Sequence, residues 1–282
     1  MKQRRMLSYI EETSPIHSLC GAVKLLIFLE WSILVMVSFH TPILLTLSLF
    51  GLFLFFVSKI RLSDVSSIAK MMVLFLALNL VTVYLFSPEQ GVMIYKTRNV
   101  ILEGNPHFAN GRFTLTAEQL FYEFNIFLKY IAIIPPAVLL IVTTHPSEFA
   151  ASLNRIGVPF TASYSVSLTL RYIPDVQRDF EAISQAQQAR GLELSGKASW
   201  VKRLKRTLPL LLPLILSSLD RIEIISRAME LRGFGKNKKR SWYSAKPFTR
   251  LDIVSLAAST VLFALGIWLT FKNGNRFFSP FN

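Results

Sequence analysis

Five long apolar stretches dominate this chain and limit the folds that are open to it. They run roughly over 19–39, 41–58, 68–86, 126–144 and 250–271. A helix needs about 20 mostly apolar residues to cross the hydrocarbon core of a bilayer. Hydrophobic residues make up 52% of the 282 positions and charged residues 17%, with a mean hydropathy of +0.43. We therefore expect an all-α, polytopic membrane protein with about five transmembrane helices.

The charges in the connecting segments predict the orientation, because Lys and Arg accumulate on the cytoplasmic side of a membrane. The segment 146–249 holds 17 Lys or Arg against eight Asp or Glu, so it is expected inside. The N-terminus and the second connection are basic too, through Lys2, Arg4, Arg5, Lys59, Arg61 and Lys70. The connection 87–125 is slightly acidic and is expected outside. Lys272 and Arg276 would also be external, against the general trend.

These expectations divide a multi-pass protein of the cell membrane into three parts. Residues 1–145 are expected to hold transmembrane helices one to four, with an external segment near 88–124. Residues 146–249 are expected to form a cytoplasmic domain of amphipathic helices. Residues 250–282 would supply the last transmembrane helix and a C-terminal tail. The external segment could be an ordered cap or a mobile loop, and the sequence leaves both open.

Polar and helix-breaking residues inside the apolar stretches are best explained by packing. Lys24 and Glu30 lie six positions apart, on different faces of one helix, so each is expected to snorkel or to pair with another element. Pro135 and Pro136 remove backbone donors from the fourth stretch and should kink or break it. Membrane helices tolerate this where neighbouring helices satisfy the freed carbonyl groups.

Between 146 and 249, apolar residues recur at helical spacing and charges interrupt them every few positions. This pattern is typical of amphipathic helices. We expect separate segments over 161–174, 175–190, 208–219 and 220–232. The stretch 208–219 is short for a membrane span, so we expect it to be buried against the protein or to lie at the membrane interface.

Two of these helices are expected to end in the same way, with an arginine followed by a glycine. The endings are Ala189-Arg190-Gly191 and Leu231-Arg232-Gly233. An arginine in the last turn complements the helix macrodipole, and glycine commonly caps a helix, so helix capping alone is one explanation. The other is docking, because arginine forms bidentate pairs with carboxylates across interfaces. Two such endings indicate two acidic grooves, for instance on two copies of one partner.

Several other functions are not supported by the residues. The run Gly191–Lys197 has the spacing of a phosphate-binding loop, but Ala198 stands where Ser or Thr should bind magnesium, and no strand-helix alternation accompanies it. The four histidines, at 17, 40, 107 and 145, are scattered, and no span carries paired carboxylates. We therefore predict no catalytic residue, no metal site and no cofactor bound by this chain.

A net charge of +14 raises the possibility of a nucleic-acid partner. The basic cluster 236–240 is explained more simply as a charged face at the lipid headgroups, so we expect the bilayer and not nucleic acid as the partner. The single Cys20 allows no disulfide within the chain.

Several short segments together resemble a known family. They are 14–26, 143–148, 153–159, 170–174, 186–191 and 228–234. In these segments and in its paired Arg-Gly endings, the chain resembles the transmembrane component of energy-coupling factor transporters, the EcfT/CbiQ family of vitamin and metal-ion importers. Relative to the compact pattern of that family, the segment near 88–124 looks like an insertion.

The resemblance implies a non-catalytic scaffold that joins two ABC ATPase subunits to one small membrane protein, the substrate-binding (S) component. ATP and magnesium would bind to the ATPases, whose closure drives reorientation of the S component. The implied ATPase-coupling residues are Ala189, Arg190, Gly191, Ala228, Arg232 and Gly233. The implied S-component contacts are Leu168, Leu170, Leu211, Leu212 and Ile215.

Two alternatives stay open at this point. One is the permease of a conventional ABC importer, which docks its ATPases through one element in each chain instead of two. The other is an intramembrane enzyme. The transported substrate is not specified by this chain, since specificity would belong to the S component.

Overall fold

The computed structural model describes residues 14–102, 114–191, 200–235, 241–272 and 276–281. The chain divides into two compact units, unit 1 (residues 1–145 and 246–282) and unit 2 (residues 146–245). Unit 1 contains α1 (Pro15–Ser18), α2 (Gly21–Val37), α3 (Thr41–Val57), α4 (Leu62–Phe86), α5 (Gln90–Tyr95), β1 (Val100–Leu102), β2 (Leu115–Thr116), α6 (Ala117–Thr143) and α10 (Arg250–Phe271). Unit 2 contains α7 (Pro146–Arg155), α8 (Phe160–Ala189) and α9 (Trp200–Leu231). The expected all-α class is confirmed.

Helices α2, α3, α4, α6 and α10 correspond to the five apolar stretches. Three segments among the described residues are long and apolar enough to cross a membrane, namely Val65–Phe86, Ala117–Thr143 and Arg250–Phe271. Helices α2 and α3 have 17 residues each. At 1.5 Å per residue they extend about 26 Å, slightly less than the roughly 30 Å of a bilayer core. The apolar helices agree with a polytopic membrane protein, and α2 and α3 are shorter than the three segments named above.

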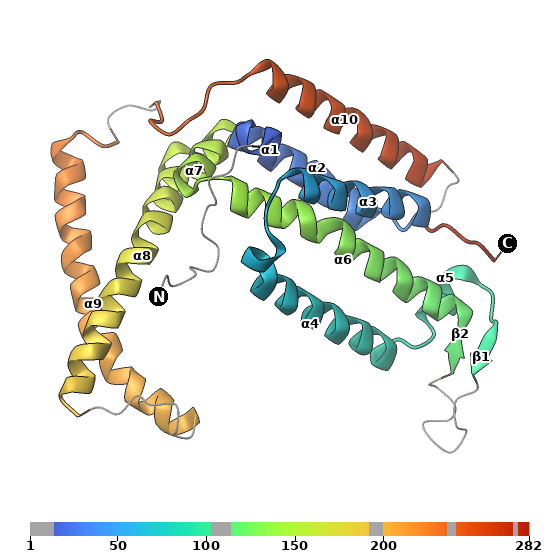
Figure 1. Cartoon of the computed structure of the whole chain (residues 1–282), viewed down its shortest axis with the longest axis horizontal. Helices are drawn as coiled ribbons and strands as arrows, with labels where there is room; N and C mark the ends of the chain where they lie inside the picture. The colour runs from blue at the N-terminus through green and yellow to red at the C-terminus, as the bar shows by residue number, and fades with distance from the viewer. Residues whose placement is uncertain (1–13, 103–113, 192–199, 236–240, 273–275, 282) are drawn as a thin grey trace. The chain divides into compact units, whose positions relative to one another are not determined.

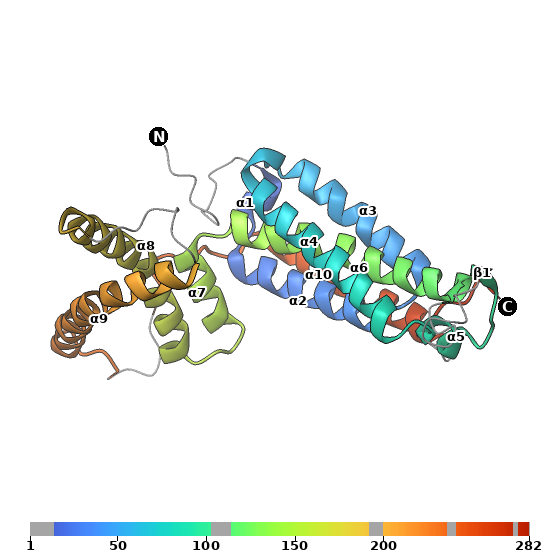
Figure 2. The same cartoon turned by 90° about the horizontal axis from the view of Figure 1, so that it is seen from below.

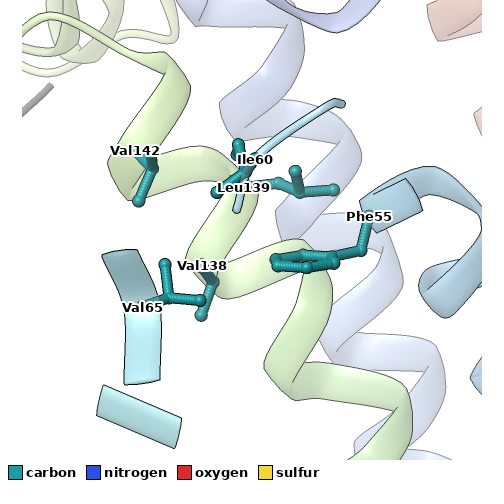
Figure 3. Close-up of a cluster of buried hydrophobic side chains, with 6 residues drawn as sticks. All are labelled: Phe55, Ile60, Val65, Val138, Leu139 and Val142. Carbon is teal, nitrogen blue, oxygen red and sulfur yellow. The ribbon is translucent and has the colours of Figure 1, made fainter. Parts of the chain in front are cut away.

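Helix α6 is the centre of unit 1 and packs against α2, α3, α4 and α5 (Figures 1 and 2). Figure 3 shows the side chains that join α6 to α3, α4 and the turn between them. This buried cluster consists of Phe55, Ile60, Val65, Val138, Leu139 and Val142. Burial of apolar side chains against a single central helix therefore orders α3 and α4 around it.

The two adjacent prolines do not break α6, which continues through both of them. Proline leaves the carbonyl group four residues before it without its helical donor. For Pro136 that carbonyl belongs to Ala132, and the indole nitrogen Nε1 of Trp31 donates a hydrogen bond to it at 2.9 Å. A neighbouring helix thus satisfies the freed acceptor, as a helix in lipid requires.

The Trp31→Phe variant tests this role of the indole. We expect it to lower the free energy of unfolding by about 1–2 kcal/mol, because it leaves a buried carbonyl group unsatisfied while keeping an aromatic ring in place. Thermal unfolding in detergent measures the change. Trp268→Phe is the matched control, because Trp268 is more than half exposed on α10. Equal melting temperatures for the two variants would contradict this role.

The two charged residues of α2 pair with other elements, one of the two outcomes expected. Lys24 Nζ donates to the carbonyl oxygen of Thr143, at the end of α6, at 2.8 Å. Glu30 accepts hydrogen bonds from Ser259 at 2.6 Å and from Thr260 at 2.7 Å, both in α10. The charged groups of α2 therefore join α6 and α10, and neither forms a proton relay with the other.

The segment near 88–124, which was predicted to be external, is packed in the part that the structure describes. Strand β1 pairs with β2 in antiparallel fashion, and the buried carboxylate of Glu118 accepts hydrogen bonds from the backbone and side-chain nitrogens of Asn99 at 3.0 and 2.9 Å. The backbone N–H of Gly91 donates to Gln119 at 2.9 Å. These contacts favour an ordered cap over a loop. Residues 103–113, which include His107, lie outside the described residues.

The expected division of unit 2 into shorter helices is wrong. Helix α8 is continuous through Pro174, and α9 is continuous through Pro209 and Pro213. A proline in a helix costs about 3 kcal/mol, but helices of 30 and 32 residues keep most of their hydrogen bonds on either side. Figure 1 shows α9 bent along its length, the usual result of proline within a helix.

Candidate functional site

The two arginine endings share one backbone geometry. Gly191 and Gly233 have φ of +92° and +64°, in the left-handed region that glycine adopts without steric cost. At the second ending, the N–H of Gly233 donates to the carbonyl of Glu230, and that of Phe234 donates to Met229, both at 2.9 Å. This pair of bonds is a Schellman motif. The glycine cap predicted at position 191 is confirmed, and each arginine directly precedes its capping glycine.

A third helix ending shows that the turn does not require arginine. Helix α7 closes with Gly157 at φ +109°. Its N–H donates to Asn154 at 3.2 Å, and the N–H of Val158 donates to Leu153 at 3.0 Å. Ile156 stands there in the position that arginine occupies in the other two endings. Capping therefore explains the glycines, and it does not by itself require an arginine directly before them.

Both arginines are accessible. Arg190 and Arg232 are exposed, and within the part of the chain that the structure describes neither has an ion-pair partner. Most of the neighbouring residues predicted for coupling are exposed as well. Ala189, Gly191 and Ala228 are exposed, and Gly233 is half-buried. The endings thus present guanidinium groups that have no ion-pair partner among the described residues and can receive a carboxylate from another molecule.

The two endings lie at opposite ends of a helix pair. Helices α8 and α9 run in opposite directions, because Tyr164 near the start of α8 packs against Phe234 beyond the end of α9, with ring centroids 4.7 Å apart, and Asp179 pairs with Arg221 further along. Figure 1 shows the C-terminal ends of the two helices pointing away from each other. Each arginine lies eleven residues beyond the Asp179–Arg221 pair, which is about 16 Å of helix.

A second surface of unit 2 is an apolar stripe on α9. Its members alternate at spacings of four and three residues, so they share one helix face, and each is more than half exposed. They are Leu208, Leu212, Ile215, Leu219 and Ile222. The buried Leu210 and Arg221, which pairs with α8, lie on a different face. The stripe is therefore on the side of α9 that faces away from α8.

The predicted S-component contacts fall partly on this stripe. Leu212 and Ile215 belong to it, and the exposed Leu211 lies beside it. Leu168 and Leu170 are half-buried in α8. The sequence interpretation placed the contact on the apolar faces of 161–174 and 208–219 without naming Leu208 or Leu219, and it excluded Ile222 because it ended one helix at 219 and began another at 220. Their regular spacing across that boundary was the signal that could have included them.

Other segments singled out from the sequence lie outside the residues that the structure describes. Residues 192–197 of the phosphate-loop-like run, the basic cluster 236–240 and the N-terminal residues Lys2, Arg4 and Arg5 lie outside the described residues. No group of three or more His, Cys, Asp or Glu side chains that could hold a metal ion occurs among the described positions.

The chain is similar to transporter proteins over most of its length. A family model described as "Cobalt transport protein" (CbiQ) matches residues 12–242. The energy-coupling factor transporter transmembrane protein EcfT of Streptococcus thermophilus is 30% identical over 269 residues, which cover 93% of this chain and 95% of the relative. EcfT of Lactococcus lactis subsp. cremoris is 27% identical over 276 residues, or 94% and 98% of the two chains. EcfT of Listeria innocua is 35% identical over 153 residues, or 51% and 57%.

Proposed function

Because this chain belongs to the CbiQ/EcfT family of transporter transmembrane proteins, we propose that it is the membrane scaffold of an energy-coupling factor importer. In this proposal, Arg190 and Arg232 each seat in an acidic groove of one ABC ATPase subunit. ATP and magnesium bind to those subunits, and this chain carries no catalytic residue. Closure of the ATPases then moves the α8/α9 pair and reorients the S component in the bilayer.

One observation supports this proposal most strongly. Two exposed arginines with no ion-pair partner among the described residues occupy equivalent helix endings at opposite ends of one antiparallel pair. A spacing on the order of 30 Å, from two helical arms of about 16 Å each, suits two separate protein partners. A conventional permease docks one element in each chain, so the second ending favours the scaffold over that alternative.

The apolar stripe of α9 is proposed to receive the S component. An exposed row of large apolar side chains on a soluble surface is unfavourable in water and typically marks a protein or membrane contact. A membrane protein such as the S component offers a matching apolar surface. Its substrate would be a vitamin or a metal ion, captured by the S component and not by this chain.

The proposal also assigns sides of the membrane. Unit 2 and the N-terminus would be cytoplasmic, where ATP is available and where their excess of Lys and Arg places them. The ends of the spans that carry the segment near 88–124 would be external. The proposed function requires no cofactor bound to this chain on either side of the membrane.

Native mass spectrometry of the complex purified through a tag on this chain tests the proposal. We expect two ATPase subunits and one small membrane protein for each copy of this chain. Identification of the small molecule released from the complex would then name the substrate. Recovery of this chain with a single ATPase, or as a homodimer with two, would favour a conventional permease and overturn the scaffold.

A further inference from the structure

A cluster of charged side chains joins α8 to α9 midway between the arginine endings. Arg221 of α9 forms an ion pair with Asp179 of α8, and its guanidinium lies 3.9 Å from Asp175, one turn earlier. The guanidinium carbon is also 5.9 Å from the ring centroid of Tyr172. One arginine thus meets three residues that lie along a single face of α8.

This cluster is equally far from both endings. Asp179 precedes Arg190 by eleven residues, and Arg221 precedes Arg232 by eleven residues. Because the helices run in opposite directions, two helical arms of about 16 Å lead away from the Asp179–Arg221 ion pair, one to each arginine ending. Figures 1 and 2 show α8 and α9 lying against each other, with their ends extending in different directions. The cluster therefore lies at the centre of the helix pair that carries the two arginines.

The geometry of the cluster restricts how the helices can move against each other. A planar guanidinium between carboxylates on successive turns fits one register, because sliding by one turn, about 5.4 Å, would leave it beside at most one of the two carboxylates. The three charged side chains are each about one-third exposed. They line an open cavity of about 310 Å³ together with Tyr172 and Arg178. Because water reaches the cluster, removal of one charge leaves no fully buried ion, and variants are expected to fold.

We propose that Arg221, held by Asp179 and Asp175, is the positioning residue that fixes the register of α8 and α9. It thereby sets the separation of the two arginine endings. This inference rests on the proposed function only for the identity of the partners that the two arginine endings bind. With equal arms and a fixed centre, displacement of one ending is transmitted to the other, so both ATPase subunits act on the S component together. Without the central pair, each arm would move separately.

Distance measurement between spin labels tests the positioning role in the full chain without any partner. The labels are placed at Gln188→Cys and Glu230→Cys, both exposed and next to the arginines, in a Cys20→Ala background. We expect one narrow distance distribution. Arg221→Met should broaden it by about 5 Å, one helical turn, and the charge swap Asp179→Arg with Arg221→Asp should narrow it again.

Arg227→Met is the matched control, because Arg227 pairs with Glu223 within α9 and does not join the two helices. It should leave the distribution unchanged. An equally narrow distribution in Arg221→Met, or equal broadening in both variants, would overturn the positioning role.

Transport in the reconstituted complex supplies a second readout. We expect Arg221→Met to lower uptake per ATP hydrolysed about tenfold, since coupling between two sites typically changes an equilibrium by about 5–150-fold, while the ATPases stay bound. The charge swap should restore the ratio. If the parent complex contains no ATPase subunits while Arg221→Met still broadens the label distance, the proposed function fails and the positioning contact stands. An unchanged ratio in Arg221→Met would contradict the inference directly.

Discussion

Reversing both arginine charges, in the double variant Arg190→Glu with Arg232→Glu, will abolish ATP-driven uptake and release the ATPase subunits from the complex. Loss of a desolvated charge pair at a protein interface costs about 2–5 kcal/mol, and reversal adds repulsion from the acidic groove. Because each ATPase subunit contacts one ending, its association weakens by at least about thirtyfold. Each single variant is expected to retain one docked ATPase with little uptake. The measurements are ATPase recovery on purification and substrate uptake into vesicles.

The control for charge alone is Arg227→Glu. Arg227 is an exposed arginine on α9, five residues before the second ending, and its reversal changes the net charge of unit 2 by the same amount as either single variant. It should leave uptake and ATPase recovery near the parent values. If the double variant keeps its ATPases and transports like the parent, the two endings only cap their helices and do not dock the ATPases.

A double variant on the apolar stripe, Leu212→Glu with Ile215→Glu, will detach the S component and stop uptake, while both ATPases stay bound. Burial of each of these side chains at an interface contributes about 1.5–3 kcal/mol, and burial of a carboxylate in its place carries a further penalty. We expect affinity for the S component to fall at least about a hundredfold. Recovery of the S component relative to the ATPases is the direct measurement.

Ile224→Glu serves as the matched control for the stripe. Ile224 is as exposed as the stripe residues but lies about 120° around the helix from Leu212. Its substitution should leave the S component bound. Equal loss of the S component in the control and in the stripe variant would show that charge on α9 is harmful at any position and that the stripe is not a specific surface.

The membrane part of the fold could be predicted from sequence because its signal is local. The last span was expected over 250–271, and α10 occupies Arg250–Phe271. The partners of the charged residues could not be predicted in the same way. Lys24 bonds to a carbonyl 119 positions away, and Glu30 bonds to hydroxyl groups 229 and 230 positions away. Such pairs depend on which helices become neighbours, and no local pattern encodes that.

The helix boundaries of unit 2 could not be predicted because local rules and packing disagree there. Pro174 marked a helix end in the sequence, yet α8 continues through it. The Arg-Gly endings were predictable, since glycine in the left-handed region has a strong local signature. Their placement at opposite ends of one pair follows from the contact of Asp179 with Arg221, which only the packed helices reveal.

The most direct test of the two-ended scaffold is cross-linking from beside each arginine in the assembled transporter. Gln188→Cys and Glu230→Cys keep both arginines in place, and the Cys20→Ala background leaves one reactive thiol in each variant. With a short thiol-to-amine reagent, each single cysteine is predicted to give an adduct with an ATPase subunit, and the variant with both cysteines is predicted to give adducts with two. Adducts from only one position, or adducts with lipid alone, would contradict the account.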